Sequence, residues 1–271
     1  MNMAALVVEL VTEELPPKAL KRLGEVFAET LAAGLRSRDF LVDGSVVTPF
    51  ATPRRLAVAI SQVRAVAPDK PFKEKLLPVS VAFDALGQPT SALLGKLKAK
   101  QLSHVDPRSL LREGDGKAET LFYADIAKGG PLVNALQAAL EDALDALPIP
   151  KVMSYPGPGS YYNDEKFVRP AHLLLALHGA NVVPVTALGL SAGRTTSGHR
   201  FLSRADIAVA TADAYDETLR AEGKVVARFA ERRAQIVAAL GKAANGATVI
   251  MPDALLDEVT ALVEWPAVFA G

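Results

Sequence analysis

The chain has 271 residues, its 30 Lys and Arg balance 30 Asp and Glu, and half of its residues are hydrophobic. This composition indicates a globular protein with one large or two smaller domains and excludes a disordered chain. Zero net charge excludes capture of nucleic acid by the whole surface, but it leaves room for a local basic patch. The lack of Cys excludes disulfides, thiolate metal sites and thiol nucleophiles. With no run of about 18 apolar residues and no secretory signal, we expect a cytoplasmic protein without a membrane span.

The first region, residues 1–63, has the pattern of a β-α-β-β unit. An apolar run over 4–11, interrupted by Glu9, predicts a mostly buried strand. A proline pair then begins a helix with apolar residues at helical spacing. Two short strands are expected at 46–50 and 56–60, on either side of a polar connection. The apolar residues of the helix are Leu20, Leu23, Phe27 and Leu31.

The second region, residues 64–150, is expected to be an inserted α/β excursion that ends in a helix. It begins with a connector rich in Pro and Lys, 64–80, and continues with a Lys-rich helix near 90–102. The stretch 110–116 ends in a Gly-Asp-Gly turn, and 120–127 predicts a strand. The closing helix has leucines at every fourth position. These are Leu132, Leu136, Leu140 and Leu144.

The third region, residues 151–271, is expected to hold strands and then helices, truncated at the C-terminus. The Gly- and Pro-rich stretch 154–163 predicts a loop. Regular elements are expected over 167–179 and 182–190, and a further strand over 201–210.

Two helices are expected in the C-terminal third. Arg228 and Arg232 lie one turn apart on the polar side of the first, and Pro252 begins the second. The fold class that follows is α+β, with mixed, mainly antiparallel sheets, packed helices and more than one subdomain. The apolar face of the first helix is Val225, Val226, Phe229, Ile236, Val237 and Leu240.

A glycine-rich segment, residues 193–198, has the spacing of a phosphate loop. It is followed by His199 and Arg200, where such a loop needs Lys and then Ser or Thr, so it fails as a nucleotide-binding P-loop. Its backbone N–H groups, together with Arg194 and Arg200, still suit a phosphate. A solvated turn between strands explains the same residues.

Other polar residues leave similar alternatives. Arg54 and Arg55, at a hairpin tip, suit either a nucleic-acid backbone or, as the favoured interpretation, ion pairs with nearby acids. His172 and His178 do not share a helical face, so no metal site is expected, and a histidine in an apolar stretch is usually a hydrogen-bonded core group. Nucleophile-elbow and dinucleotide-binding motifs are absent. From the residues alone, no set supplies a reaction centre.

Seven segments together carry a family resemblance. They are 7–20 (VVELVTEELPPKAL), 51–58 (ATPRRLAV), 82–90 (AFDALGQPT), 147–151 (LPIPK), 167–172 (FVRPAH), 198–201 (GHRF) and 255–266 (LLDEVTALVEWP). In this order they resemble the β subunit of the bacterial two-subunit glycyl-tRNA synthetase over essentially the whole chain. The chain departs from the family after Lys151, where Met-Arg-Trp-Gly is usual, and at Leu173, where Trp is frequent.

The resemblance implies a division of labour in an α2β2 heterotetramer. The α subunit carries the class II catalytic core, and the β subunit mainly binds tRNA(Gly) and is needed for charging. It further implies no catalytic residue, metal or cofactor in this chain, while the assembled enzyme uses ATP and magnesium. Family β subunits are more than twice as long, so we expect an N-terminal fragment. The family's N-terminal region resembles the body and tail domains of CCA-adding enzymes.

We therefore expect cationic side chains in Gly- and Pro-bearing loops to contact tRNA phosphates or the α subunit. Two alternatives stay open: a scaffold that docks the α subunit without touching RNA, and a small-molecule hydrolase or transferase that uses His172 or His199 as its base. The expected contact residues are Arg54, Arg55, Arg169, His172, Arg194, His199 and Arg200.

Overall fold

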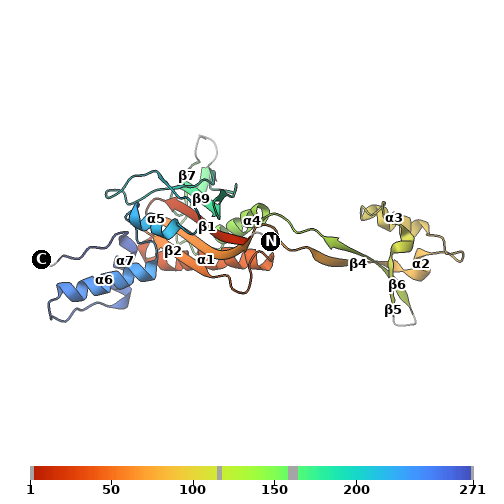
Figure 1. Cartoon of the computed structure of the whole chain (residues 1–271), viewed down its shortest axis with the longest axis horizontal. Coiled ribbons are helices and arrows are strands. Elements are labelled where there is room, and N and C mark those ends of the chain that lie inside the picture. The colour runs from red at the N-terminus through yellow and green to blue at the C-terminus, as the bar shows by residue number, and fades with distance from the viewer. Residues whose placement is uncertain (1–2, 115–117, 158–163, 270–271) are drawn as a thin grey trace. The chain divides into compact units, whose positions relative to one another are not determined.

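The computed structural model describes residues 3–114, 118–157 and 164–269. The chain divides into two compact units, one formed by Met1–Ala67 with Gly130–Gly271 and one by Pro68–Gly129 (Figure 1). Helices and mostly antiparallel strands are mixed in the chain, which confirms the α+β class. The second compact unit is shorter than the expected excursion 64–150, because the helix that closes that stretch packs in the larger unit.

The larger unit is built on a five-stranded antiparallel sheet. Its strand order is β10-β9-β1-β3-β2, so the central strand comes from the beginning of the chain and β9 from far along it. The expected first and third regions therefore share one sheet. The strands are β1 (Met3–Thr12), β2 (Val47–Thr52), β3 (Arg55–Arg64), β9 (Ala171–His178) and β10 (Asn181–Val182).

Both faces of the sheet are covered, which explains the apolar run in β1. Successive side chains of a strand point to opposite faces. Leu6, Val8 and Leu10 pack with helices α1 (Pro17–Ser37) and α4 (Leu132–Asp145), whereas Val7 packs with α5 (Tyr215–Ala221) on the other face. Seven consecutive residues of β1 are buried, Glu9 among them. The buried strand expected over 4–11 is confirmed.

Close packing of α1 depends on two of its glycines. A Cβ on Gly24 would lie 2.6 Å from the Cβ of Ala51 in β2, and one on Gly34 would lie 2.8 Å from the Cβ of Ala139 in α4. These distances are shorter than two carbon atoms tolerate, so glycine lets the helix approach the sheet and α4. The buried face of α1 includes the expected Leu20, Leu23, Phe27 and Leu31.

We expect Gly24→Ala to lower the free energy of unfolding by about 1–3 kcal/mol, because the added methyl group overpacks the contact with Ala51. The matched control is Gly95→Ala, which lies within a helix with nothing within 4 Å of the added Cβ. There the higher helix propensity of Ala is expected to stabilise by up to about 1 kcal/mol. Urea unfolding of both variants measures the difference, and equal shifts would contradict the packing argument.

The smaller unit is a three-stranded antiparallel sheet with short helices on it. Its core is formed by Leu76, Leu93, Leu97 and Leu121 with neighbouring apolar residues. The 64–80 connector is corrected here: Lys70–Pro78 form strand β4, which pairs with β6 from Lys70 to Lys75 and again at Pro78. The other elements are α2 (Val79–Ala82), α3 (Ser91–Ala99), the 3-10 turn Pro107–Ser109, β5 (Leu111–Gly114) and β6 (Glu119–Ala127).

The strand escaped prediction because most of β4 is exposed, so its lysines and proline give no alternating apolar pattern. Pairing with β6 makes the strand, and β6 lies 45 residues or more further along the chain. Of the expected Gly-Asp-Gly turn, Asp115 and Gly116 lie outside the described residues.

Two further expectations need correction. The stretch 154–163 was expected to be loop throughout, but 154–156 lie in β7 (Met153–Pro156), which pairs with β8 (Asp164–Phe167); 158–163 lie outside the described residues. The strand expected over 201–210 is reduced to β14 (Ile207–Ala208). Phe201 and Leu202 lie in an exposed turn, because no strand is available beside them. The remaining pairs are β11 (Thr186–Ala187) with β12 (Leu190–Ser191), and β13 (Thr195–Thr196) with β14.

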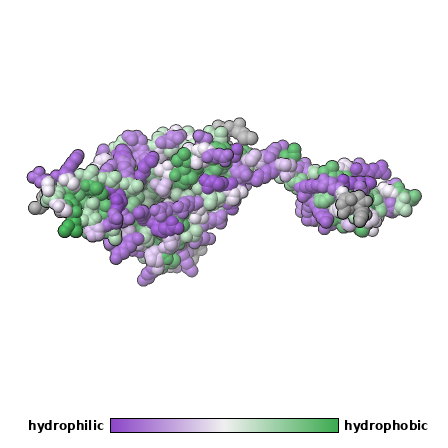
Figure 2. All heavy atoms as spheres, turned by 90° about the horizontal axis from the view of Figure 1, so that it is seen from below, coloured by the Kyte–Doolittle hydropathy of each residue, from purple (hydrophilic) through white to green (hydrophobic). Residues whose placement is uncertain are grey.

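The two expected C-terminal helices are present as α6 (Phe229–Ala243) and α7 (Asp253–Leu262). Val225 and Val226 precede α6 as buried extended chain. Arg232, expected on the polar side of its helix, is fully buried and donates hydrogen bonds to backbone carbonyls. Hydrophobic side chains are exposed at this end of the larger unit, where Figure 2 shows a hydrophobic patch. They include Ile250, Leu255, Leu262 and Phe269.

Candidate functional site

Three of the expected cationic residues converge on one carboxylate, that of Glu13 at the end of β1. The Nε2 atom of His172 lies 3.0 Å from Oε1 of Glu13, and Nη2 of Arg200 lies 3.4 Å from Oε2. Nη2 of Arg54 lies 3.8 Å from Oε1. We call Glu13 with these three residues the Glu13 cluster.

Sheet topology brings these residues together. β1 lies between β3 and β9, so its end meets the β2–β3 turn that carries Arg54 and the beginning of β9 that carries His172. Backbone hydrogen bonds hold the connection in place: the Thr12 N–H donates to the Arg54 carbonyl at 2.8 Å, and the Glu13 N–H donates to the Pro170 carbonyl at 2.9 Å. The cluster is therefore positioned by the sheet.

Arg169 lies beside the cluster. Its Nε donates to the carbonyl of Glu14 at 2.9 Å, and its Nη1 donates to the carbonyl of Val168 at 3.0 Å. These bonds leave part of the guanidinium unused, since arginine carries five N–H donors.

The Glu13 cluster is open to solvent and carries surplus positive charge. The side chains of Glu13, His172 and Arg200 are 38%, 46% and 51% exposed. Partial burial raises the pKa of Glu13, but the hydrogen bond with His172 and the two guanidinium charges outweigh it, so the pKa lies below its ordinary value. Two guanidinium groups face one carboxylate, which leaves at least one positive charge uncompensated.

Arg55 is placed very differently from its neighbour Arg54. It is 1% exposed, and its Nη1 lies 3.3 Å from Oε1 of Glu9, while its Nη2 donates to the Ser197 carbonyl at 2.7 Å. The Nη2 atom also lies 3.7 Å from the carboxylate of Glu264. This is the structural ion pairing that the sequence favoured, and its burial leaves Arg55 with no surface to offer a phosphate.

The buried ion pairs are completed by hydroxyl groups. The Tyr215 hydroxyl donates to Oε1 of Glu9 at 2.6 Å, and the Thr52 hydroxyl donates to Oε1 of Glu264 at 2.7 Å. Burial raises the pKa of Tyr215 well above its usual value, so the phenol stays protonated as a donor. We call Glu9, Thr52, Arg55, Tyr215 and Glu264 the buried network.

His199 and Arg194 occupy other positions. Nδ1 of His199 accepts the N–H groups of Phe201 and Leu202 at 3.2 and 3.3 Å, so the imidazole holds the turn that follows Arg200. Arg194 donates to the Ala180 carbonyl at 2.8 Å, beyond the end of β9 opposite to His172. The structure thus brings Arg54, Arg169, His172, His199 and Arg200 into one neighbourhood, but not Arg194.

A cavity of about 310 Å³ adjoins the Glu13 cluster. Arg54 and Arg200 line it together with two aromatic side chains, Phe201 and Trp265. Sequence reasoning missed both aromatic residues and Glu13. The segments VTEELPP, GHRF and VEWP contain all three, but only the fold shows that they meet. The other lining residues are Glu14, Pro53, His199, Leu262, Val263 and Glu264.

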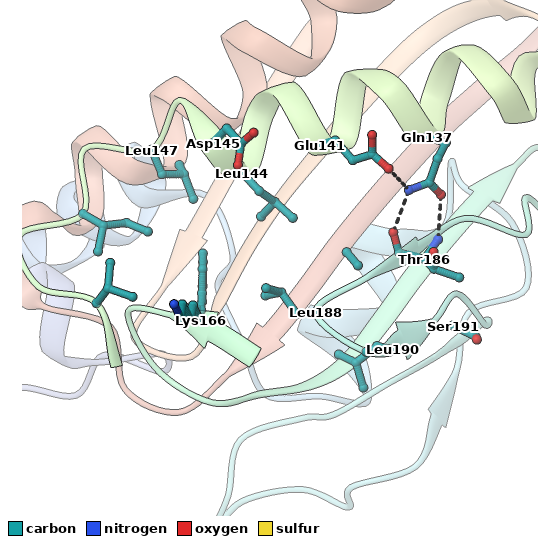
Figure 3. A pocket seen from close by; sticks show the side chains of 15 residues that line it. Gln137, Glu141, Leu144, Asp145, Leu147, Lys166, Thr186, Leu188, Leu190 and Ser191 are labelled. Carbon is teal, nitrogen blue, oxygen red and sulfur yellow. Dashed lines mark hydrogen bonds between the residues drawn. The ribbon is translucent and has the colours of Figure 1, made fainter. Parts of the chain in front are cut away.

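A larger cavity, about 1010 Å³, lies between α4 and the β11–β12 hairpin (Figure 3). The amide of Gln137 donates to the Thr186 carbonyl at 2.9 Å and accepts the Thr186 N–H at 2.8 Å, which ties the hairpin to α4. Several leucines line the remainder, and none of the seven expected contact residues does so. The cavity therefore shows apolar lining and structural hydrogen bonds, without converging cations.

The described residues contain no group of three or more His, Asp or Glu side chains placed to hold a metal ion. Among the helices of the same residues, none has both the length and the apolar content needed to cross a membrane.

Comparison with known proteins points in one direction. The family model of the glycyl-tRNA synthetase beta subunit matches residues 6–271. Over 98% of its length the chain is 52% identical to the glycine–tRNA ligase beta subunit of Ralstonia nicotianae. It is 51% identical over 100% of its length to that of Aromatoleum aromaticum, and 54% identical over 97% to that of Leptothrix cholodnii.

The chain spans only 39%, 38% and 37% of these three relatives. The family model nevertheless covers all but its first five residues. Because this match extends over nearly the whole chain, the protein belongs to the glycyl-tRNA synthetase beta-subunit family.

Proposed function

We propose that the chain forms the part of a glycine–tRNA ligase β subunit that binds tRNA(Gly) through phosphate groups. In this proposal it supports the ATP- and magnesium-dependent glycylation carried out in the cytoplasm with the α subunit, within an α2β2 enzyme. The observation that carries the proposal is the exposed Glu13 cluster in a member of this family. Guanidinium groups bind phosphate oxygens through two parallel N–H bonds, and Arg54 and Arg200 face the same point.

The site favours binding over chemistry. His172 is engaged with Glu13, and Nδ1 of His199 accepts two backbone N–H groups, so neither imidazole is paired with a nucleophile in the described residues. A base acting in catalysis needs such a partner within hydrogen-bond reach. This arrangement supports an anion-binding surface on a subunit whose reaction takes place elsewhere.

We expect Arg200→Ala to weaken tRNA binding and to reduce the slope of log K against log salt by roughly 0.7–0.9, because one phosphate contact is lost. The matched control is Arg194→Ala, since Arg194 is also an exposed arginine but lies at the other end of β9. Fluorescence anisotropy with labelled tRNA over a salt series measures both quantities. Equal effects of the two substitutions would place the contact elsewhere, and an unchanged slope for Arg200→Ala would contradict the proposal.

A second candidate function is docking of the α subunit without contact to RNA. The exposed hydrophobic residues of α7, Leu255 at 53% and Leu262 at 61%, favour a protein contact on this side of the unit. Footprinting of tRNA with and without the chain separates the two functions. Protection of tRNA positions supports RNA binding, whereas binding of the α subunit with no tRNA protection supports the scaffold.

A further inference from the structure

Two exposed aromatic rings lie next to the Glu13 cluster. Phe201 is 85% exposed and Trp265 is 38% exposed, and both line the cavity of about 310 Å³ that Arg54 and Arg200 also line. A cavity of this size is at the lower end of the range for small-molecule sites. It thus combines flat apolar surfaces with two guanidinium groups.

Phe201 is held in its exposed position by its own turn. The backbone N–H groups of Phe201 and Leu202 donate to Nδ1 of His199, and the N–H of His199 donates to the Gly223 carbonyl at 2.7 Å. The ring centroids of His199 and Phe201 are 6.2 Å apart. Because the turn is pinned at both ends, the ring is presented to solvent by design of the local backbone, and His199 acts as a positioning residue.

Trp265 is also prepared for a polar environment. The Nζ atom of Lys224 lies 5.7 Å from the centroid of its ring, a cation–π contact. The preceding residue, Glu264, belongs to the buried network through Thr52 and Arg55. The tryptophan is therefore anchored to the core by its neighbour while its ring lines the cavity.

We propose that this cavity binds one unpaired nucleotide of an RNA, with the base stacked on Phe201 or Trp265 and its phosphate between Arg54 and Arg200. In the free chain the Glu13 carboxylate occupies the anion position, and the phosphate replaces it. Stacking on an aromatic side chain needs a base face that is not covered by neighbouring bases, which only an unpaired nucleotide offers. The inference rests on the proposed function for RNA as the source of the nucleotide.

Trp265 itself reports on the site, because it is the only Trp of the chain. We expect a short single-stranded RNA to quench its fluorescence in a saturable manner. The same sequence in a duplex and inorganic phosphate at equal phosphate concentration are expected to leave the fluorescence nearly unchanged. Phe201→Ala is expected to weaken binding of the single strand about 5- to 150-fold, the range measured for loss of one stacked base. The control, Phe269→Ala, removes another exposed ring that does not line the cavity and should leave the affinity unchanged.

A parallel anisotropy titration with labelled tRNA separates this inference from the proposed function. If tRNA binds but the single strand does not quench Trp265, or the duplex quenches it equally, the nucleotide site is wrong while the proposed function stands. Equal displacement by inorganic phosphate would reduce the cavity to a simple anion site and overturn the inference. If tRNA does not bind at all, the proposed function itself fails.

Discussion

Replacing Arg55 by Ala is expected to lower the free energy of unfolding of the larger unit by about 3–5 kcal/mol. The guanidinium lies between the carboxylates of Glu9 and Glu264, and all three side chains are buried. Removing it leaves two negative charges out of water without a partner. Unfolding in urea, followed by circular dichroism, measures the loss.

The matched control for Arg55→Ala is Arg54→Ala. Arg54 is next in the chain, but its pair with Glu13 is at the surface at 3.8 Å, so the expected change is below about 1 kcal/mol. A further variant combines Arg55→Met with Glu9→Gln and Glu264→Gln, and part of the lost stability should return because no charge stays buried. Equal losses for Arg54 and Arg55 would show that the buried network contributes nothing special.

The Arg55 substitution also reaches the candidate site. Its Nη2 holds the Ser197 carbonyl at 2.7 Å, just before the turn that carries His199 and Arg200. We therefore expect Arg55→Ala to disturb the position of that turn although Arg55 itself touches no ligand.

Replacing Arg232 by Ala is expected to destabilise by about 3–5 kcal/mol as well. This buried side chain donates to the carbonyls of Thr260 at 3.0 Å, Val226 at 2.7 Å and Ala51 at 2.7 Å. It thereby joins α6 and α7 to β2 of the sheet. Burial lowers the pKa of Arg232 to about 10, so it is charged at neutral pH, and its loss leaves buried carbonyl groups without donors.

The effect should be local as well as global. We expect the amide protons of α6 and α7 to exchange faster in Arg232→Ala than those of the five-stranded sheet, because these helices lose their tie to β2. The control is Arg233→Ala, one residue along, where the side chain pairs with Asp253 and Asp257 at the surface and a change below about 1 kcal/mol is expected. Uniform exchange across the unit would contradict a linking role for Arg232.

Local patterns predicted the elements whose faces are strongly apolar. The helix with Leu20 and Leu23, and the buried strand interrupted by Glu9, follow from spacing alone. The patterns failed where pairing supplies the structure, as in β4, whose side chains are mostly exposed and whose partner β6 is distant in the chain. They also failed at Arg232, because helical spacing shows which side a residue occupies but not what later covers that side.

For the candidate site, sequence alone indicated the residue types and left their grouping open. Arg54 and Arg55 are adjacent and have the same side chain, yet one lies at the surface beside Glu13 and the other is sealed inside. The alternation of a strand sends neighbours to different surroundings, but which surroundings is a property of the assembled sheet.

The sequence by itself determined the family, the α+β class and the zero net charge that excludes capture of RNA by the whole surface. Only the tertiary structure decided which cations lie together. Strand order places β1 between β3 and β9, and this brings Arg54, His172 and Arg200, from three distant segments, onto the Glu13 carboxylate. The physical reason is that contacts between distant segments follow from how their buried faces pack, and local spacing carries no information about that packing.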